Sequence, residues 1–372
     1  MIYFDNAATT PSLFGIKNDV FSNPSSPHGL GILAERELEK SRHLLRTLLG
    51  IKGNITFTSG GTESNNLAII GFALANKRNN ITIFAEPWEH PSILEPIKFA
   101  KEHIGCTAHI APKEMWQTSS KGIQLVCISH VNHETGNIND VLAMAQTLKN
   151  ENSQTIMLVD GAQGFCKEDF SPIFSQTDFK NIDMYSFSGH KCHAATGVGG
   201  LAIRDGVRIT PLLYGGGQEN RLRPGTENLD GILILSQTAK TLFESKASHH
   251  VHVTTIKAAL SSITNELSNV VVNSRAGMVS PYILNMSFLG VKGETLVHLL
   301  SEKKIYASMG AACRSRKRIK SSLEIMGFDQ AIATSAVRFS FSHLNTVEEA
   351  ICAKKIIIES VKQLRRVLGY KR

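Results

Sequence analysis

The sequence predicts an α/β fold in which a large domain, built on a mainly parallel sheet, is followed by a smaller α+β domain. Short runs rich in Val and Ile alternate with longer amphipathic stretches, long helix-like sequence follows, and the last part mixes strand and helix signals. A chain of 372 residues, 42% of them hydrophobic, is too long for one ordinary core and apolar enough to fill two.

The strands of the predicted sheet are short apolar runs at 55–59, 81–86, 124–129, 156–160, 183–188 and 199–204. Helical patterns lie between several of them, for example at 62–76, 91–103 and 140–150. This alternation favours a mainly parallel sheet with helices on both faces. Functional side chains are then expected where strands end and helices begin.

The last third of the chain has a different pattern. Residues 232–268 form long helix-like sequence that is suited to connect a large domain to a smaller one. The tail carries strand signals at 282–288 and 337–342 and helical patterns at 294–303 and 347–366. His249, His250 and His252 lie in polar connecting sequence, where we expect a solvated turn and not a metal site.

The composition is that of a soluble globular protein. Six cysteines are scattered without a CxxC pair, so neither a disulfide framework nor a zinc site is indicated. No apolar run approaches the roughly 18 residues of a membrane helix, and the N-terminal MIYFDNAATT lacks the features of a secretion signal. We therefore expect a cytoplasmic protein with no membrane partner and no bound metal.

The basic charge lies in the C-terminal part. Residues 314–372 hold 13 Lys and Arg against five Asp and Glu, a surplus that equals the net charge of +8 of the whole chain. The densest segment is RSRKRIK at 314–320. Two interpretations stay open: a solvated loop, or a surface for an acidic partner or a nucleic acid.

A phosphate cradle is predicted at TSGGTESNN, residues 58–66, where a strand runs into two glycines and then a helix. Glycines let the backbone approach an anion, the helix N-terminus offers N–H groups, and Thr62 adds a hydroxyl. The same pattern is also compatible with an ordinary helix start.

Two further residues suit a heterocyclic aldehyde cofactor. Asp160 ends the apolar run IMLVD, where it can cap a turn or pair with the protonated ring nitrogen of pyridoxal phosphate. Lys191 follows another strand, in SGHKCHAATGVGG. It is either a surface lysine or an amine placed to form a Schiff base with an aldehyde.

At this point the sequence resembles a known family, the cysteine desulfurases of the NifS/IscS type, which are class V members of the fold-type-I pyridoxal-phosphate enzymes. The resemblance extends over almost the whole chain and rests on the motifs YFDNAATTP, NPSSPHGLG, FTSGGTESNNLAI, the EH of WEHPSIL, HVNHETG, VDGAQ, YSFSGHK, YGGGQENRLRPGTEN, NMSFLGVKGETL, SMGAAC and VRFSFS. It implies that pyridoxal 5'-phosphate is the cofactor and L-cysteine the substrate.

The resemblance also implies the roles of individual residues. Lys191 would hold the cofactor, and the small residues after it would leave room for the cofactor and let strand and loop pack closely. His90 would stack on the ring and serve in proton transfer, and Arg338 would bind the substrate carboxylate. The remaining cofactor contacts implied are Gly61, Thr62, Ser188 and His190 for the phosphate, Thr226 for the phosphate of a neighbouring subunit, Asp160 for the ring nitrogen, and Gln163 and His133 for the ring hydroxyl oxygen.

Cys313, in SMGAAC, stands where the family has its nucleophile. The resemblance implies that its thiolate attacks the substrate sulfur, which leaves a persulfide on Cys313 and yields L-alanine. The positive charges of the Lys and Arg side chains in 314–320 are expected to favour the thiolate form of Cys313. Cys192, although adjacent to Lys191, is not the expected nucleophile.

The chain departs from the family pattern at five places, of which the unusually basic loop after Cys313 is one. HVNHE stands where HVNNE is usual, so that His133 replaces an asparagine beside the ring hydroxyl. RPGT replaces RSGT, which stiffens the loop but keeps Arg223 and Thr226. The segment between TTP and NPSS is about ten residues shorter than expected, and GHKCHAATG replaces GHKIYGPKG.

The resemblance implies a homodimer, with a large domain over residues 15–250 and a small domain formed by residues 1–14 and 251–372. The persulfide would pass to a sulfur acceptor, docked near 314–320, for iron–sulfur cluster assembly, tRNA thiolation or DNA phosphorothioation. Two alternatives remain: a selenocysteine lyase or another class V enzyme of the same fold, and a docking subunit of a sulfur-modification complex.

Overall fold

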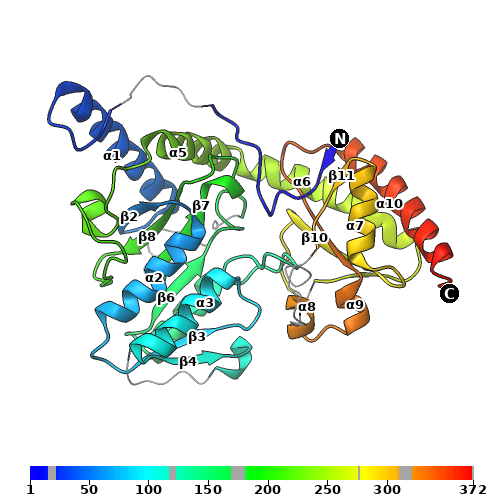
Figure 1. Cartoon of the computed structure of the whole chain (residues 1–372), viewed down its shortest axis with the longest axis horizontal. Helices are drawn as coiled ribbons and strands as arrows, with labels where there is room; N and C mark the ends of the chain where they lie inside the picture. Colours follow the sequence, from blue (N-terminus) through cyan, green and yellow to red (C-terminus); the bar gives the residue numbers. More distant parts are fainter. Residues whose placement is uncertain (16–21, 117–122, 169–180, 275–276, 310–320, 371–372) are drawn as a thin grey trace. The chain divides into compact units, whose positions relative to one another are not determined.

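The computed structural model describes residues 1–15, 22–116, 123–168, 181–274, 277–309 and 321–370 (Figure 1). The chain divides into two compact units. The first, which we call the sheet unit, comprises Pro11–His130 and Asn139–Ser245, and the C-terminal unit comprises Met1–Thr10, Val131–Ile138 and Lys246–Arg372.

The segment Val131–Ile138 was not expected in the C-terminal unit. It belongs there because Asn137 forms a β-bridge with Val279, and because the side chain of Asn285 donates to the carbonyl oxygen of Glu134 at 3.1 Å. The unit boundaries after Thr10 and after Ser245 replace the expected ones after residues 14 and 250.

The sheet unit is built on seven strands in the order β2-β8-β7-β6-β5-β3-β4. All neighbouring strands from β7 to β4 are parallel, and β8 runs antiparallel to both β2 and β7. The strands span Gly53–Thr58 (β2), Ile81–Ala85 (β3), Thr107–Ile110 (β4), Ile123–Ser129 (β5), Ile156–Asp160 (β6), Met184–Ser188 (β7) and Gly199–Arg204 (β8). The prediction of a mainly parallel sheet is confirmed.

Both faces of this sheet are buried, which explains the continuous apolar runs in the sequence. On β5, Val126 and Ile128 point to one core, and Leu125 and Cys127 point to the other. One face is covered by α1 (Gly29–Leu49), α4 (Val141–Glu151) and α5 (Leu229–Glu244), and the other by α2 (Gly61–Ala75) and α3 (Pro91–Phe99).

The C-terminal unit surrounds a core of its own. The antiparallel sheet β12-β10-β9 comprises Ala336–Ser340, Ile283–Phe288 and Val270–Val272, and β1 (Ile2–Tyr3) pairs in parallel with β11 (Ile305–Tyr306). Its helices are α6 (Lys246–Ser261), α7 (Gly293–Glu302), α8 (Ser322–Ile325), α9 (Gln330–Thr334) and α10 (Val347–Val367). The expected mixture of strands and helices is confirmed.

The prediction of a solvated turn at the three histidines was wrong. His249, His250 and His252 lie within α6, whose core face is formed by the regularly spaced Val253, Ile256 and Leu260. The ring of His249 stacks on that of His343, with 4.1 Å between centroids. A polar first turn concealed a helix whose apolar residues come later.

Other elements also differ from the sequence expectations. Residues 232–268 contain most of α5 and all of α6, two helices that belong to different units. The pattern at 91–103 is an α-helix that continues as a π-helical turn over Ala100–Ile104. The helix α1 and the edge strand β4 were not predicted. Among the described helices, none combines the length and hydropathy that crossing a membrane requires.

Candidate active site

The carboxyl ends of three parallel strands bring polar residues to one edge of the sheet unit. β5 ends at Ser129, β6 at Asp160 and β7 at Ser188. Ser129 is in register with Asp160, and Asp160 with Ser186. In open parallel sheets this edge is the usual place for a ligand.

Asp160 is buried at this edge with defined partners. Its Oδ2 accepts a hydrogen bond from the amide nitrogen of Asn65 at 2.9 Å, and its Oδ1 accepts one from the backbone N–H of Ala162 at 2.9 Å. Both oxygens of the Asp160 carboxylate are therefore held by donors at the ends of the strands.

The glycine loop, residues 59–61, lies against Ser188, as a phosphate cradle requires. A Cβ atom added to Gly61 would lie 3.5 Å from the Cβ of Ser188, and one added to Gly60 would lie 3.7 Å from its Oγ. Gly60 also has φ +155°, which side chains rarely adopt. The first turn of α2, with Thr62 exposed, opens directly beside β7.

Lys191 ends a short 3-10 turn, Gly189–Lys191, directly after β7. The small residues around it allow close packing: a Cβ on Gly199 would lie 2.6 Å from the Cα of Gly60. Cys192 is buried, and its thiol lies 3.3 Å from the carbonyl oxygen of Gly189. The strand β8 and the glycine loop thus meet backbone to backbone beside Lys191.

His90 is the N-cap residue of α3. Its Nδ1 accepts a hydrogen bond from the backbone N–H of Ser92 at 3.1 Å and lies 2.8 Å from the Ser92 hydroxyl. Burial and the charge of Lys191 lower the pKa of His90, whereas Asp160 raises it. These effects place Lys191 and Asp160 within electrostatic reach of the ring. His90, Thr62 and Asn66 line one cavity of about 370 Å³.

Gln163 and His190 lie near another lysine, Lys167, which is buried. Lys167 donates to Oε1 of Gln163 at 3.3 Å, and burial lowers the pKa of Lys167 to about 8. The pKa of His190 is lowered by burial and by the charges of Lys191 and Lys167. Gln163 thus accepts from Lys167 through Oε1, and its amide nitrogen is the donor end of that side chain.

Thr226 lies exposed on the loop between Arg221 and α5. The same loop is attached to the glycine loop by Arg223, which donates to Glu63 at 3.0 Å. Glu63 in turn accepts from the backbone N–H of Ser59 at 2.7 Å. The loop therefore holds Thr226 at the surface of the sheet unit.

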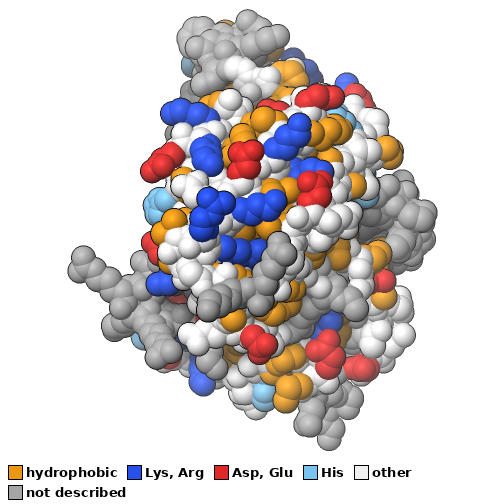
Figure 2. All heavy atoms as spheres, turned by 90° about the vertical axis from the view of Figure 1, so that its right-hand side faces the viewer, with side chains coloured by type: hydrophobic (Ala, Val, Ile, Leu, Met, Phe, Trp, Pro, Cys, Tyr) orange, Lys and Arg blue, Asp and Glu red, His pale blue; other side chains and the backbone are white. Residues whose placement is uncertain are grey.

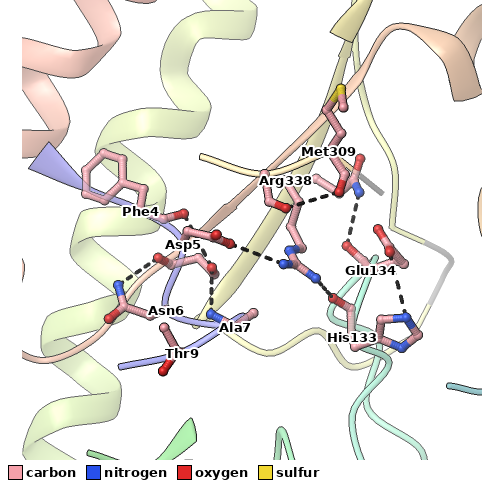
Figure 3. Close-up of polar contacts among 12 residues, drawn as sticks. Phe4, Asp5, Asn6, Ala7, Thr9, His133, Glu134, Met309 and Arg338 are labelled. Carbon is pink, nitrogen blue, oxygen red and sulfur yellow. Dashed lines mark hydrogen bonds and ion pairs between the residues drawn. The ribbon is translucent and has the colours of Figure 1, made fainter. Parts of the chain in front are cut away.

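In the C-terminal unit, the structure brings Arg338 and His133 together (Figure 3). Nη1 of Arg338 donates to the carbonyl oxygen of His133 at 2.8 Å, and Nη2 lies 3.3 Å from Oδ1 of Asp5. The His133 ring lies 3.7 Å from the Glu134 carboxylate. The guanidinium is thus oriented by an acceptor on either side.

Cys313 lies outside the described residues, as does the basic segment 314–320. The described chain ends shortly before it, at Ser308 and Met309. Ser308 exchanges two backbone hydrogen bonds with Arg338, of 2.8 and 3.1 Å. Ser308, five residues before Cys313 in the sequence, is therefore paired with Arg338.

Sequence reasoning missed several polar residues of this edge. Asn65, Ser92 and Ser186 form buried hydrogen bonds around Asp160 and His90. Asn65 belongs to a run of five polar residues, 62–66, at the start of α2, so the sequence pattern did not single it out. Glu89, buried beside His90, and Lys167 were also not singled out.

Comparisons with known proteins show which family this chain resembles. The model of the aminotransferase class-V family matches residues 2–351. A "NifS/IcsS protein homolog" from Lactobacillus delbrueckii subsp. bulgaricus is 36% identical over 368 residues, covering 94% of each chain. "Cysteine desulfurase IscS" from Buchnera aphidicola subsp. Acyrthosiphon pisum is 32% identical over 390 residues, covering 98% of this chain and 94% of that one.

The fold is likewise similar to a solved structure described as a NifS-like protein, with a TM-score of 0.85 and 30% identity over the full length of both chains. The fold is that of a class V, fold-type-I enzyme. The chain belongs to the aminotransferase class-V family and, within it, to the cysteine desulfurases of the NifS/IscS type.

Aminotransferase class V is a family of pyridoxal-phosphate enzymes, and the sheet unit fits that cofactor. The space between Gly61 and Ser188 is kept open by the absence of a Cβ at Gly61. The N-terminus of a 15-residue helix faces that space, which suits a phosphate. Asp160 supplies a buried carboxylate suited to a protonated ring nitrogen.

Proposed function

We propose that this protein is a pyridoxal-phosphate-dependent cysteine desulfurase that converts L-cysteine to L-alanine and transfers the sulfur to Cys313. The observation that carries the proposal is the buried Asp160 carboxylate, held by Asn65 and Ala162 at a strand end within electrostatic reach of His90. The family membership of the chain and the names of its relatives support the same activity.

The sheet unit supplies the residues that would hold the cofactor. Its phosphate would be bound by the N–H groups of Gly61 and Thr62 together with Ser188 and His190, its ring nitrogen by Asp160, and its aldehyde carbon by Lys191. Gln163 would donate to the ring hydroxyl oxygen. When bound, this cofactor supplies an electron sink for a carbanion at the substrate Cα.

The residues of the chain bind the substrate and move its protons. Arg338 would bind the substrate carboxylate through a planar, two-pronged contact. Lys191 would take the Cα proton, because its amine is the basic group that follows β7. The pKa of His190 is lowered, so its imidazole would be neutral. It would donate a hydrogen bond to the phosphate, whose charge the N-terminus of α2 already stabilises.

Cys313 would attack the substrate sulfur as a thiolate. A sulfur–sulfur bond forms between Cys313 and the substrate, and the substrate Cβ–S bond breaks. The electron pair of the broken bond stays on the carbon skeleton, and protonation of that skeleton gives alanine. In sum, L-cysteine and the Cys313 thiol become L-alanine and a Cys313 persulfide, and no external oxidant is needed. The basic neighbours at 314–320 would favour the thiolate.

The persulfide would pass to an acceptor that docks near residues 314–320. The charge of that segment favours an acidic acceptor protein, and a nucleic acid is the alternative occupant. Among the described residues of the C-terminal unit, α10 carries exposed Lys and Arg side chains, among them Lys355, Lys362 and Arg366. On the face of the molecule that Figure 2 shows, Lys and Arg side chains gather in the middle, with Asp and Glu among them.

A homodimer would complete the site. Thr226 is exposed on a loop that Arg223 ties to Glu63. An exposed hydroxyl held this firmly is suited to reach the phosphate of a second copy. Sedimentation of the cofactor-loaded enzyme tests whether it is a dimer. Cofactor retention by Thr226→Ala tests separately whether Thr226 helps to hold the phosphate.

The activity is tested by measuring alanine and sulfide released from L-cysteine with a reductant, for wild type, Lys191→Ala and Cys313→Ser. Wild type should release equal amounts, Lys191→Ala should lose the bound-cofactor absorbance, and Cys313→Ser should keep the absorbance but lose sulfide. Cys352→Ser, at an exposed cysteine of α10, is the matched control and should behave as wild type. Equal turnover by Cys313→Ser and wild type would refute the assigned nucleophile. Comparing turnover of selenocysteine with turnover of L-cysteine separates a selenocysteine lyase from a cysteine desulfurase.

A further inference from the structure

Four side chains form a continuous hydrogen-bonded row at the edge of the sheet unit. Asp160 Oδ2 accepts from Nδ2 of Asn65, the same nitrogen donates to Oγ of Ser92, both at 2.9 Å, and Ser92 Oγ lies 2.8 Å from Nδ1 of His90. Asp160, Asn65 and Ser92 are more than nine-tenths buried. The row connects β6, α2 and α3.

The direction of each hydrogen bond in this row is fixed by chemistry. The Asn65 atom beside Oδ2 of Asp160 is the amide nitrogen Nδ2, and an amide nitrogen only donates. The other end of that amide, Oδ1, accepts from the hydroxyl of Ser186 at 2.6 Å. Since Asn65 donates to the Ser92 oxygen, the hydroxyl proton of Ser92 is directed to Nδ1 of His90.

A second donor acts on the same ring nitrogen. His90 caps α3, and the backbone N–H of Ser92 points at Nδ1 from 3.1 Å. A backbone N–H cannot accept a proton, so Nδ1 must present its lone pair. A ring proton at Nδ1 would face this N–H and the positive end of the helix dipole. The charge of Lys191 also opposes protonation of His90, whereas the charge of Asp160 favours it.

We propose that Asn65 and Ser92 are positioning residues that hold His90 as a neutral imidazole with its proton on Nε2. In that tautomer His90 acts as a hydrogen-bond donor and a flat neutral ring. To accept a proton it would have to give up both hydrogen bonds at Nδ1. Lys191 therefore carries the proton transfer at the substrate, a narrower role for His90 than the family resemblance implies.

Nitrogen NMR of the holoenzyme labelled with ¹⁵N-histidine tests the tautomer directly. The signals of His90, one of 14 histidines, are identified by their loss in His90→Gln. At pH 7 we expect an unprotonated Nδ1 and a protonated Nε2. A proton on Nδ1, alone or on both nitrogens, would overturn the proposal. The assignment of roles rests on the proposed function, but this measurement needs no turnover, so an inactive protein with this tautomer would refute only the function.

Variants test the contributions of Ser92 and Asn65. Ser92→Ala keeps the backbone donor and removes the hydroxyl, so the protonation midpoint of His90 should rise by about 0.5–1 pH unit. Ser64→Ala, which removes a buried hydroxyl bonded to Thr58 at 2.8 Å, should leave the midpoint unchanged. An equal shift in both, or none in Ser92→Ala, would contradict the role of Ser92.

Asn65 is tested through a double-mutant cycle with Ser92. Asn65→Leu should raise the midpoint as well, because the Ser92 hydroxyl is then no longer directed toward Nδ1. If Asn65 acts through Ser92, the two shifts are not additive in the double variant. Additive shifts would show that Asn65 does not position His90.

Discussion

Arg42 and Glu219 form a buried, two-pronged ion pair, with Nη1 2.7 Å from Oε2 and Nη2 3.0 Å from Oε1. Glu219 also accepts from the backbone N–H of Phe57 at 2.9 Å. Glu219, Asn220 and Arg221 have φ of 49°, 54° and 65°, the left-handed region that costs a non-glycine residue about 1 kcal/mol or more. The ion pair thus holds the strained start of the loop that carries Thr226.

Removing Arg42 should therefore destabilise the fold strongly. Arg42→Met leaves the buried Glu219 carboxylate without its cation, and we expect the free energy of unfolding to fall by about 3–5 kcal/mol. Urea unfolding monitored by circular dichroism measures it. Lys40→Met, which breaks an exposed pair with Glu37, should change stability by less than about 1 kcal/mol. Similar values for the two variants would contradict the role given to the buried pair.

The strands of the sheet unit could be predicted from the sequence to within about two residues at each end. Both faces of the sheet are buried, so the strands are mainly apolar runs, and the polar residue that ends β6, Asp160, marks the edge. β4 was missed because it is a short edge strand with exposed residues such as Thr107. The histidines of α6 were misjudged because the polar first turn of that helix resembles a loop.

The contacts within the candidate site could not be predicted in the same way. Asn65 meets Asp160 across 95 residues, and Arg42 meets Glu219 across 177. Such pairs depend on how α1 and α2 pack on the sheet, and local pattern carries no information on this. The motif match drew attention to His90 and Lys191, but the tautomer of His90 follows only from the position of Ser92 in the first turn of α3.

A second prediction concerns the pH dependence of stability. Glu89 is buried, its Oε1 accepts from the N–H and hydroxyl of Ser129 at 3.0 and 3.2 Å, and its Oε2 has no hydrogen-bond partner among the described residues. Burial raises the pKa of Glu89 from 4.5 to about 8. Between these values the folded protein holds a proton that the unfolded chain has released, so this group makes stability fall as pH rises.

The contribution of Glu89 has a slope of at most about 1.4 kcal/mol per pH unit. Glu89→Gln keeps the acceptor for Ser129 and cannot ionise, so its unfolding free energy should fall less steeply than that of wild type between pH 5 and 8. Chemical denaturation at several pH values measures the slope. Glu102→Gln, at an exposed carboxylate, is the control, and a Glu89→Gln slope equal to that of wild type would show that Glu89 is ionised in the fold.

A third prediction concerns the contact between β8 and the glycine loop. A Cβ on Gly199 would lie 2.6 Å from both the Cα of Gly60 and the carbonyl oxygen of Phe187, and neither backbone atom can move aside by a rotamer change. Gly199→Ala should reduce stability by about 1–3 kcal/mol and weaken binding of pyridoxal phosphate. Thermal unfolding and a cofactor titration measure the two effects.

The control for this variant is Gly29→Ala. A Cβ there meets nothing within 4 Å, and alanine at the start of α1 should leave stability equal or slightly higher. If Gly199→Ala binds the cofactor as tightly as Gly29→Ala does, the close approach of the two backbones does not shape the phosphate site.

The last prediction separates the charge of Arg338 from its shape. Its guanidinium donates to His133 O and lies beside Asp5, which leaves a planar group oriented for a carboxylate. Arg338→Lys keeps the charge but cannot hold these contacts and a two-pronged ligand together. We expect kcat/KM for L-cysteine to fall by about 10²-fold, equivalent to roughly 2.7 kcal/mol, with cofactor content unchanged. Arg365→Lys, at an arginine that donates to the carbonyl oxygens of Ser268, Asn269 and Leu289, should alter stability but not kcat/KM. A comparable loss of kcat/KM in both variants would mean that Arg338 supports the fold of the C-terminal unit and not the substrate.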